Sequence, residues 1–266
     1  MFELIEKGDL KYYKSSLFEN TGAVKHGFST RLGGVSEGCY YSLNLHSYSG
    51  DDWNKVLENF KIISGALGMM RDRLVLSQQT HEDKIIDVDE THCGNGILYE
   101  NKFASADALI TNKKNVPIAV FSADCVTVLF LDNKNGVIAA AHSGWRGTVM
   151  RIAQKTAERM ISKYGSKPED ILVAIGPSIQ EDCFEVGDDV AEIFIDEFGD
   201  DTAKKYGERY HVNMQTAIIN QLAQVGIGRE NIDNSGICTA CNPDLLYSHR
   251  KMGNARGNLG AFLELV

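Results

Sequence analysis

The chain has 266 residues, of which 43% are hydrophobic and 24% are charged, a composition typical of a globular protein with a sizeable core. Its net charge of −9 and its acidic pI near 5.3 argue against general binding to nucleic acid or to an anionic membrane surface. No apolar run approaches the roughly 18 residues of a membrane-spanning helix, and the N-terminus lacks the pattern of a secretory leader. No linker interrupts the chain, so we expect a single cytoplasmic domain over residues 1–266.

The hydrophobic pattern predicts strands that alternate with amphipathic helices. Apolar, β-rich runs predict strands within residues 1–30 and at residues 74–81, 85–89, 106–111, 116–121, 171–175 and 261–266. Apolar positions at helical spacing predict helices at residues 52–68, 148–165, 188–198 and 214–225.

The stretch from Ser122 to Thr148 carries the main chemical signal. Two β-rich runs flank a turn that contains Asn-Gly, which predicts a hairpin. If the turn centres just after Asn133, Cys125 lies opposite His142, with the two side chains on one face and their Cα atoms roughly 4.5–5.5 Å apart. A thiolate and an imidazole at that separation can share a metal ion or a proton, whereas a slip of one residue would place them on opposite faces.

Three residues that suit zinc lie near predicted strand ends: His81, Cys125 and His142. A Cys-His₂ set leaves a fourth position for water or substrate, which is typical of catalytic zinc. Spacing alone does not join His81 to the other two. Asp124 is a candidate to transfer protons or to orient a ligand. The rival interpretation is a metal-free pair in which Cys125 is the nucleophile and His142 is its base.

Two glycine-bearing turns predict anion binding. The first, Gly144–Gly147, precedes a predicted helix with Thr148 as its N-cap, where free N–H groups attract an anion. Ser143 and Arg146 would add hydrogen bonds and charge there, and Arg31 lies in the second turn. The further candidates for binding substrate or phosphate are Asn44, Gln79 and Arg250.

The six cysteines are spread widely along the chain: Cys39, Cys93, Cys125, Cys183, Cys238 and Cys241. In a chain of this length and predicted location we expect free or metal-bound thiols and no disulfide framework. Cys238 and Cys241 form a C-x-x-C, but no second Cys or His pair stands at the spacing of a structural zinc site. We interpret them as structural thiols and leave a redox role or a second metal open.

Three segments are specific in combination: Gln79–His81, Ala123–Cys125 and His142–Thr148. Together they resemble the signature of the laccase-domain family, whose members are also called multicopper polyphenol oxidoreductase-like proteins, purine nucleoside phosphorylases and peptidoglycan editing factors. Supporting segments extend the resemblance over essentially the whole chain, at residues 28–36, 42–45, 176–179 and 236–239.

The resemblance implies a single α/β domain of the type found in the catalytic domain of cytotoxic necrotizing factor, with a central mixed sheet flanked by helices. It implies His81, Cys125 and His142 as metal ligands. It also implies phosphorolysis of adenosine, inosine and methylthioadenosine to the base and ribose 1-phosphate, and hydrolytic deamination of adenosine. Zinc is the expected metal, and the affinity order of such ligands also permits copper. The partners would be a purine nucleoside and phosphate, bound by a monomer or a dimer.

The histidine content weighs against the oxidase name. The chain has seven histidines and none are two positions apart, whereas several copper centres need many histidines, commonly in H-x-H pairs. We therefore predict a zinc-dependent purine nucleoside phosphorylase with adenosine deaminase activity. The alternatives are a copper-binding polyphenol oxidase, a metal-free cysteine hydrolase acting on a peptidoglycan precursor, and a nucleotide-binding protein without turnover.

Overall fold

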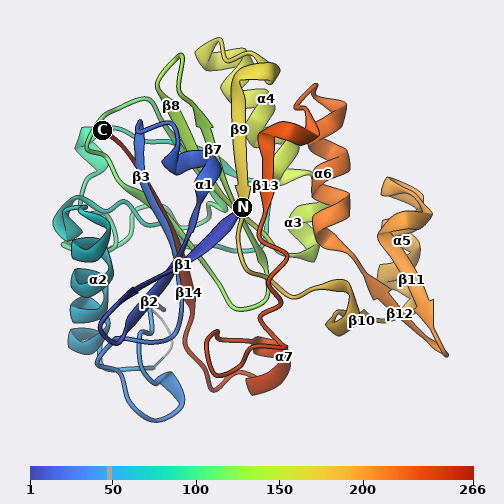
Figure 1. The fold of residues 1–266 in the computed structure, drawn as a ribbon, viewed down its shortest axis with the longest axis horizontal. Coiled ribbons are helices and arrows are strands. Elements are labelled where there is room, and N and C mark those ends of the chain that lie inside the picture. The colour runs from blue at the N-terminus through green and yellow to red at the C-terminus, as the bar shows by residue number, and fades with distance from the viewer. Residues whose placement is uncertain (47–49) are drawn as a thin grey trace.

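The computed structural model describes residues 1–46 and 50–266, which build two large β-sheets packed between layers of helices (Figure 1). The first sheet has the strand order β1-β2-β3-β14-β6 and is antiparallel throughout. Its strands are β1 (Phe2–Lys7), β2 (Leu10–Ser15), β3 (Val24–Ser29), β14 (Leu259–Leu265) and β6 (Ile118–Ser122).

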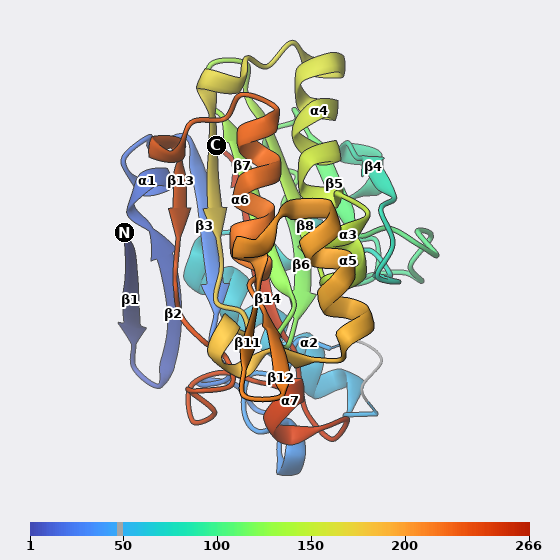
Figure 2. The ribbon, with the colours of Figure 1, turned by 90° about the vertical axis from the view of Figure 1, so that its right-hand side faces the viewer.

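The second sheet has the order β13-β9-β7-β8-β5-β4 and is mixed, because only its two edge pairs, β13 with β9 and β4 with β5, are parallel. Its strands are β13 (Ile232–Asn234), β9 (Ile171–Ile175), β7 (Val126–Asp132), β8 (Val137–Ser143), β5 (Ala108–Thr111) and β4 (Ile85–Asp87). A small third sheet lies to one side with α5 (Figures 1 and 2). Its strands are β10 (Glu185–Val186), β12 (Arg209–Val212) and β11 (Ala203–Tyr206).

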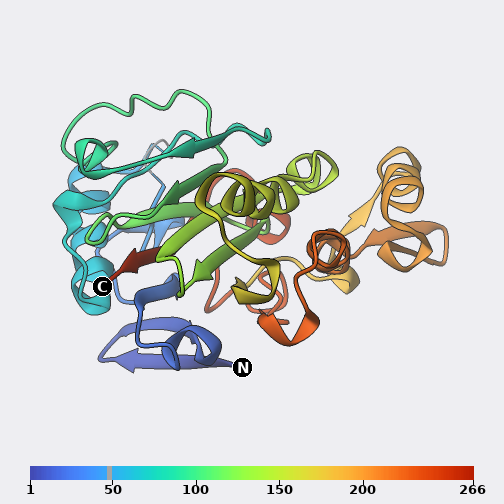
Figure 3. The ribbon, with the colours of Figure 1, turned by 90° about the horizontal axis from the view of Figure 1, so that it is seen from above.

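The two large sheets pack face to face and the helices cover their outer faces, which Figure 3 shows from above. Alternate residues of β7 explain this layering. Leu129 packs toward the first sheet, whereas Phe130 packs in the cluster that α4 and α6 cover. On the far side of the first sheet, Phe60 and Ile63 of α2 pack beside Phe262. The helices are α1 (Ser16–Glu19), α2 (Trp53–Leu67), α3 (Trp145–Val149), α4 (Ile152–Tyr164), α5 (Asp188–Phe198), α6 (Met214–Gln224) and α7 (His249–Met252).

The predicted α/β class and most predicted elements are confirmed, but the single central mixed sheet that was predicted is wrong, because two large sheets pack face to face in its place. Helix α2 begins after Asp52, whose side chain accepts the N–H of Asn54, and it ends at Gly68 in the left-handed conformation (φ 74°). Helix α5 has its predicted bounds, and α6 ends one residue earlier than predicted. Within the described residues, none of the helices has both the length and the apolar character that crossing a membrane requires.

The helix predicted from Thr148 begins earlier and is divided in two. Gly144, in an extended conformation, is the N-cap of the short helix α3, and Arg151 at φ 63° separates α3 from α4. The Thr148 hydroxyl donates to the carbonyl of Gly144 over 3.0 Å, inside the turn. The prediction that Thr148 is the N-cap was therefore wrong. Thr148 lies within α3, and its side chain bonds back to the N-cap residue Gly144.

The strand predicted at residues 74–81 is also wrong, because only Val75 forms a bridge, with Ile118. Further along, the side-chain amide of Gln79 pairs with the backbone of Phe121 in β6, as a neighbouring strand would. Its amide nitrogen donates to the carbonyl of Phe121 and its oxygen accepts the N–H of Phe121, both over 2.7 Å. A side-chain amide thus provides the pairing that the backbone of a strand would have provided.

Candidate metal centre and adjoining cavities

The hairpin of β7 and β8 is confirmed, but its register differs from the predicted one. Thr127, and not Cys125, pairs with His142. Because side chains alternate between the two faces of a strand, a shift of two positions leaves Cys125 on the same face as His142. The thiol and the imidazole therefore still approach each other, along a diagonal of the hairpin.

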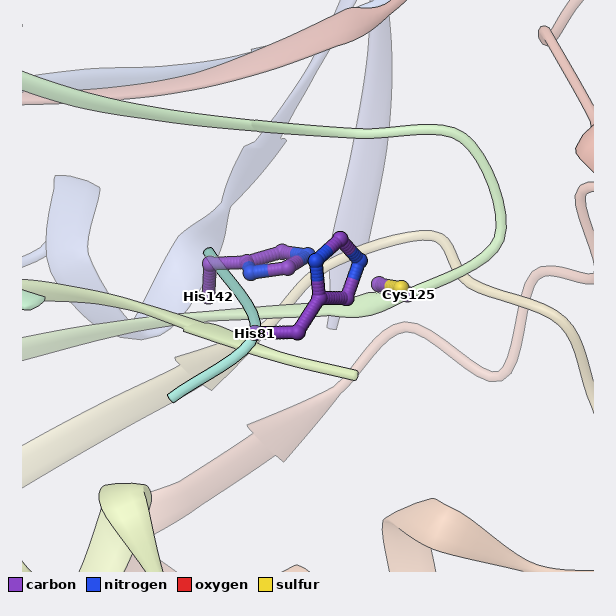
Figure 4. Close-up of side chains that lie close together, drawn as sticks. All are labelled: His81, Cys125 and His142. Carbon is purple, nitrogen blue, oxygen red and sulfur yellow. The ribbon is translucent and has the colours of Figure 1, made fainter. Parts of the chain in front are cut away.

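The side chains of His81, Cys125 and His142, which we call the Cys-His₂ cluster, point toward one another (Figure 4). Their ligand atoms all lie within 4.8 Å of one another. The two imidazole rings are nearly perpendicular, with centroids 4.8 Å apart. His142 is buried, Cys125 is half-buried and His81 is exposed, so the cluster is enclosed on the sheet side and accessible on the His81 side.

Gly144 makes room for this cluster. A Cβ atom at this position would lie 3.0 Å from the sulfur of Cys125 and 3.0 Å from Cδ2 of His81. Any larger residue would therefore occupy the space in which the ligand side chains meet.

Asp107, directly before β5, connects two members of the cluster. Its buried carboxylate lies 2.8 Å from Nδ1 of His142 and accepts the N–H of His81 over 3.1 Å. The same carboxylate accepts the N–H groups of Thr80 and Glu82. It thus fixes the orientation of His142, leaves Nε2 free for a ligand, and holds the loop that carries His81.

Two residues at the site have left-handed backbone conformations without being glycine: His81 at φ 62° and Asp124 at φ 93°. Such conformations cost about 1–3 kcal/mol each and persist where the surroundings hold them. The carboxylate of Asp124 accepts the hydroxyl of Thr239 over 2.6 Å and the N–H of Arg250 over 2.7 Å. Asp124 therefore ties two distant segments to the residue next to Cys125.

The electrostatics of the cluster favour charge separation in the metal-free protein. Burial by itself raises the pKa of Cys125, but His142 and His81 outweigh it and lower the pKa to about 6. Burial lowers the pKa of His142, but the neighbouring Cys125 and Asp107 raise it to about 9. At neutral pH the pair is a thiolate and an imidazolium. A metal ion would bind the thiolate directly and displace the imidazolium proton.

Two cavities meet at the cluster. The first, of about 320 Å³, has polar walls that include His46, Gln79 and Asn258. The second, of about 370 Å³, has largely apolar and aromatic walls that include Trp145, Ile179, Phe184 and Met214, with Asp124, His249 and Arg250 as polar members. His81, Cys125 and Arg256 line both. The volumes lie in the range of small-molecule sites, and we refer to them as the polar and the aromatic cavity.

Arg256 lies where the cavities meet, and no motif in the sequence had marked it. One guanidinium nitrogen donates to the carbonyl of Gly257 over 3.1 Å and to the side chain of Asn258. Its Nε is buried and has no hydrogen-bond partner among the described residues. Burial lowers the pKa of Arg256, but a guanidinium in a protein stays charged. A half-buried guanidinium that lines both cavities beside the cluster is suited to bind an anion.

Two of the residues predicted to bind substrate or phosphate line a cavity, with their polar groups partly engaged. Gln79 lines the polar cavity while pairing with Phe121. Arg250 lines the aromatic cavity, and its guanidinium donates to the carbonyls of Cys183 and Glu185.

The other four predicted residues line neither cavity. Arg31 donates to the carbonyls of Tyr41 and Pro243 and lies over the ring of Tyr247, so it braces a loop. Arg146 is exposed over the ring of Trp145.

Asn44 and Ser143 are both fully buried. The Asn44 amide donates to Asp51, and its oxygen accepts the N–H of Asn258. The hydroxyl of Ser143 lies 2.9 Å from that of Thr148. Local hydrogen bonding accounts for both, so these residues hold the chain near the site and do not face a ligand.

Replacing Asp107 with Asn is expected to weaken metal binding about 10–100-fold, the usual effect of losing a carboxylate that orients a histidine ligand. The amide still fits the pocket but cannot accept all the N–H groups that now converge on the carboxylate. Competition with a chromogenic chelator measures the change. Asp89→Asn, at an exposed carboxylate beside a different histidine, is the control. Unchanged metal affinity in Asp107→Asn would remove the positioning role.

Fold and site together define a mixed α/β protein with a Cys-His₂ cluster between two cavities. Residues 25–266 match the family described as multi-copper polyphenol oxidoreductase laccase, and the chain belongs to this family. The resemblance inferred from three sequence segments is thereby confirmed.

The chain is similar to known relatives and to solved structures over nearly its whole length. The chain is 33% identical to a purine nucleoside phosphorylase of Bacteroides thetaiotaomicron, over 96% of this chain and 95% of that protein. It is 35% identical to adenosine deaminase RL5 of an unknown prokaryotic organism, over 85% and 88% of the two chains. The crystal structure of the hypothetical protein YfiH from Bacillus licheniformis superposes with a TM-score of 0.92 at 30% identity, covering 100% of this chain and 99% of that one. YlmD from Geobacillus stearothermophilus gives a TM-score of 0.91 at 28% identity, with 98% of each chain covered.

Proposed function

We propose that the protein is a zinc-dependent purine nucleoside phosphorylase that also deaminates adenosine. The observation that carries this proposal is the position of Arg256, a half-buried cation, next to the Cys-His₂ cluster at the junction of a polar and an aromatic cavity. The names of two relatives, a purine nucleoside phosphorylase and an adenosine deaminase, support the same two reactions.

The donor set fits zinc. Two imidazoles and one thiol converge within 4.8 Å, and Asp107 leaves the outer nitrogen of His142 free. When bound by three protein ligands, zinc acts as a Lewis acid and lowers the pKa of a coordinated water toward ~7. Copper is the alternative metal, because the same ligands bind it at least as strongly.

The purine base and the sugar with its phosphate occupy different cavities. Trp145, Phe184 and Met214 give the aromatic cavity the flat apolar walls that suit a purine base. The polar cavity receives the ribose and the phosphate, with the guanidinium of Arg256 holding the anion. The ribose carbon that reacts therefore lies near Cys125 and His81, where the cavities meet.

Phosphorolysis exchanges one bond at C1′ of the ribose for another. An oxygen of dihydrogen phosphate forms a bond to C1′ while the bond from C1′ to the purine nitrogen breaks. The electron pair leaves with the base, which takes up the proton that the phosphate gives up. Arg256 orients the phosphate for this attack and offsets its charge.

The proposal also includes the predicted domain extent, fold type, cellular location and oligomeric state. They are a single domain over residues 1–266 of the cytotoxic necrotizing factor type, a cytoplasmic location, and a monomer or a dimer. The substrates remain adenosine, inosine and methylthioadenosine, and Asp124 remains a candidate for proton transfer, although both its oxygens accept hydrogen bonds within the protein.

One observation favours a second candidate function. The thiolate of Cys125 beside the imidazolium of His142 is also the resting state of a cysteine hydrolase, here one acting on an amide such as a peptidoglycan precursor. A multicopper oxidase needs several copper centres that are rich in histidine. Among the described residues, only the Cys-His₂ cluster brings histidine together with other metal-binding side chains in a group of three. The oxidase is therefore less well supported.

Protein purified without added metal, analysed for bound metal and then incubated with adenosine, tests the proposal. We expect stoichiometric zinc, with adenine and ribose 1-phosphate formed only when phosphate is present and inosine formed with or without it. Activity on an amide that survives chelation but not thiol alkylation would favour the hydrolase. Nucleoside binding without any product over hours would contradict an enzymatic role.

A further inference from the structure

Three cysteines outside the Cys-His₂ cluster converge on one point. Cys183 ends the short 3-10 helix Glu181–Cys183, whereas Cys238 and Cys241 lie in a loop that follows β13. Their sulfur atoms all lie within 4.8 Å of one another, and those of Cys183 and Cys241 are 3.3 Å apart. Cys183 completes the C-x-x-C that appeared to lack partners in the sequence.

We propose that Cys183, Cys238 and Cys241 form a second metal site, which binds a single thiophilic ion of the Zn²⁺ type. Tetrahedral zinc with Zn–S bonds of about 2.3 Å places its sulfur ligands about 3.8 Å apart. Sulfurs that all lie within 4.8 Å suit one such ion and are too close together to surround a multi-iron cluster. Cys241 is exposed, so the fourth position is open to water.

The three thiols differ in exposure: Cys238 is buried, Cys183 is half-buried and Cys241 is exposed. Three thiolates whose sulfurs lie within 4.8 Å of one another repel strongly, and a cation bound between them removes this repulsion. A metal ion therefore favours the ionised form that ligation requires.

The alternative to a metal ion is a disulfide, which accounts for only two of the three thiols. It would join Cys183 to Cys241, require an oxidant, and leave Cys238 as a third thiol against the bond. A metal ion uses all three sulfurs.

The proposed site would hold part of the wall of the aromatic cavity. The carbonyl of Cys183 accepts a hydrogen bond from Arg250 over 3.0 Å, and the next residue, Phe184, lines that cavity. In the other segment, Thr239 lies between the two cysteines and donates to Asp124, the neighbour of Cys125. A metal ion at the second site would therefore fix two segments that reach the substrate cavity from different parts of the chain.

Zinc stoichiometry tests the proposal without relying on activity. The reduced protein is loaded with Zn²⁺, passed through a desalting column and analysed by elemental mass spectrometry. We expect two ions per chain in the wild type, one in His81→Ala/Cys125→Ala, and none when Cys241→Ser or Cys183→Ser is added to that double variant. Cys39→Ser, at an exposed cysteine outside both clusters, is the matched control and keeps the ion. In the double variant, Co²⁺ should give strong sulfur-to-cobalt charge-transfer absorption that either further substitution removes.

Several outcomes would overturn the proposal. The double variant would bind no Zn²⁺ under reducing conditions, or its bound Zn²⁺ would survive both cysteine substitutions. Thiol counting and peptide mapping that find a bond from Cys183 to Cys241 in protein free of metal would instead establish the disulfide. Thermal unfolding confirms that the variants are folded, and two different cysteines are substituted so that one unstable variant does not decide the result.

Discussion

Cys125→Ala is expected to lose its zinc from the Cys-His₂ cluster and to lose both phosphorolysis and deamination, each by more than about 100-fold. The reason is that removing a direct ligand exceeds the 10–100-fold effect of removing a residue that only orients one. His81 and His142 alone cannot hold the ion at an exposed site. Zinc analysis together with product analysis on adenosine, with and without phosphate, measures both losses.

The control for this substitution is Cys93→Ala, a partly buried cysteine that belongs to neither cluster. It should keep zinc and both activities. If Cys125→Ala kept both activities, the catalytic assignment of the cluster would be wrong. The wild type could instead show an amidase activity that does not depend on metal. Loss of that activity in Cys125→Ala would favour the cysteine hydrolase.

Arg256→Met is expected to raise the KM for phosphate about 10–150-fold and to leave the phosphate-independent deamination of adenosine nearly unchanged. A hydrogen bond to a charged group contributes about 1.5–3 kcal/mol, which corresponds to this range of affinity. Methionine preserves much of the length and packing of the side chain in the junction between the cavities. Initial rates at varied phosphate, compared with inosine formation, separate the two effects.

Arg146→Met is the matched control, because this exposed arginine lines neither cavity. It also compares the earlier sequence-based candidate directly with the residue that the structure favours. An increase in the phosphate KM for Arg146→Met and none for Arg256→Met would reverse the assignment. An equal loss of phosphorolysis and deamination in Arg256→Met would mean that the residue acts on the nucleoside or on the fold.

Local patterns predicted much of the secondary structure, because they depend on neighbouring residues alone. The helix after Asp52 has both a side-chain N-cap and a glycine C-cap, and each is readable within one turn. The small sheet around β12 escaped prediction because its strands are short and mostly exposed, so no apolar alternation marks them.

The face shared by Cys125 and His142 was predicted correctly although the register was not. Side chains on a strand alternate with a period of two, so an error of two positions changes the partner and preserves the face. The strand predicted before His81 failed for a different reason. A side-chain amide, that of Gln79, replaces the backbone pairing, and sequence periodicity cannot reveal this substitution.

The sequence by itself determined which kinds of chemistry this chain carries: a thiol and an imidazole on one hairpin, a second histidine that suits a metal, and a C-x-x-C. The tertiary structure alone decided which side chains support them. Asp107, Arg256 and Cys183 come from distant segments, and no spacing rule connects them with their partners. The physical reason is that hydrogen bonds and metal ligation act over a few ångströms in space, whereas sequence patterns report only what neighbouring residues on one element share.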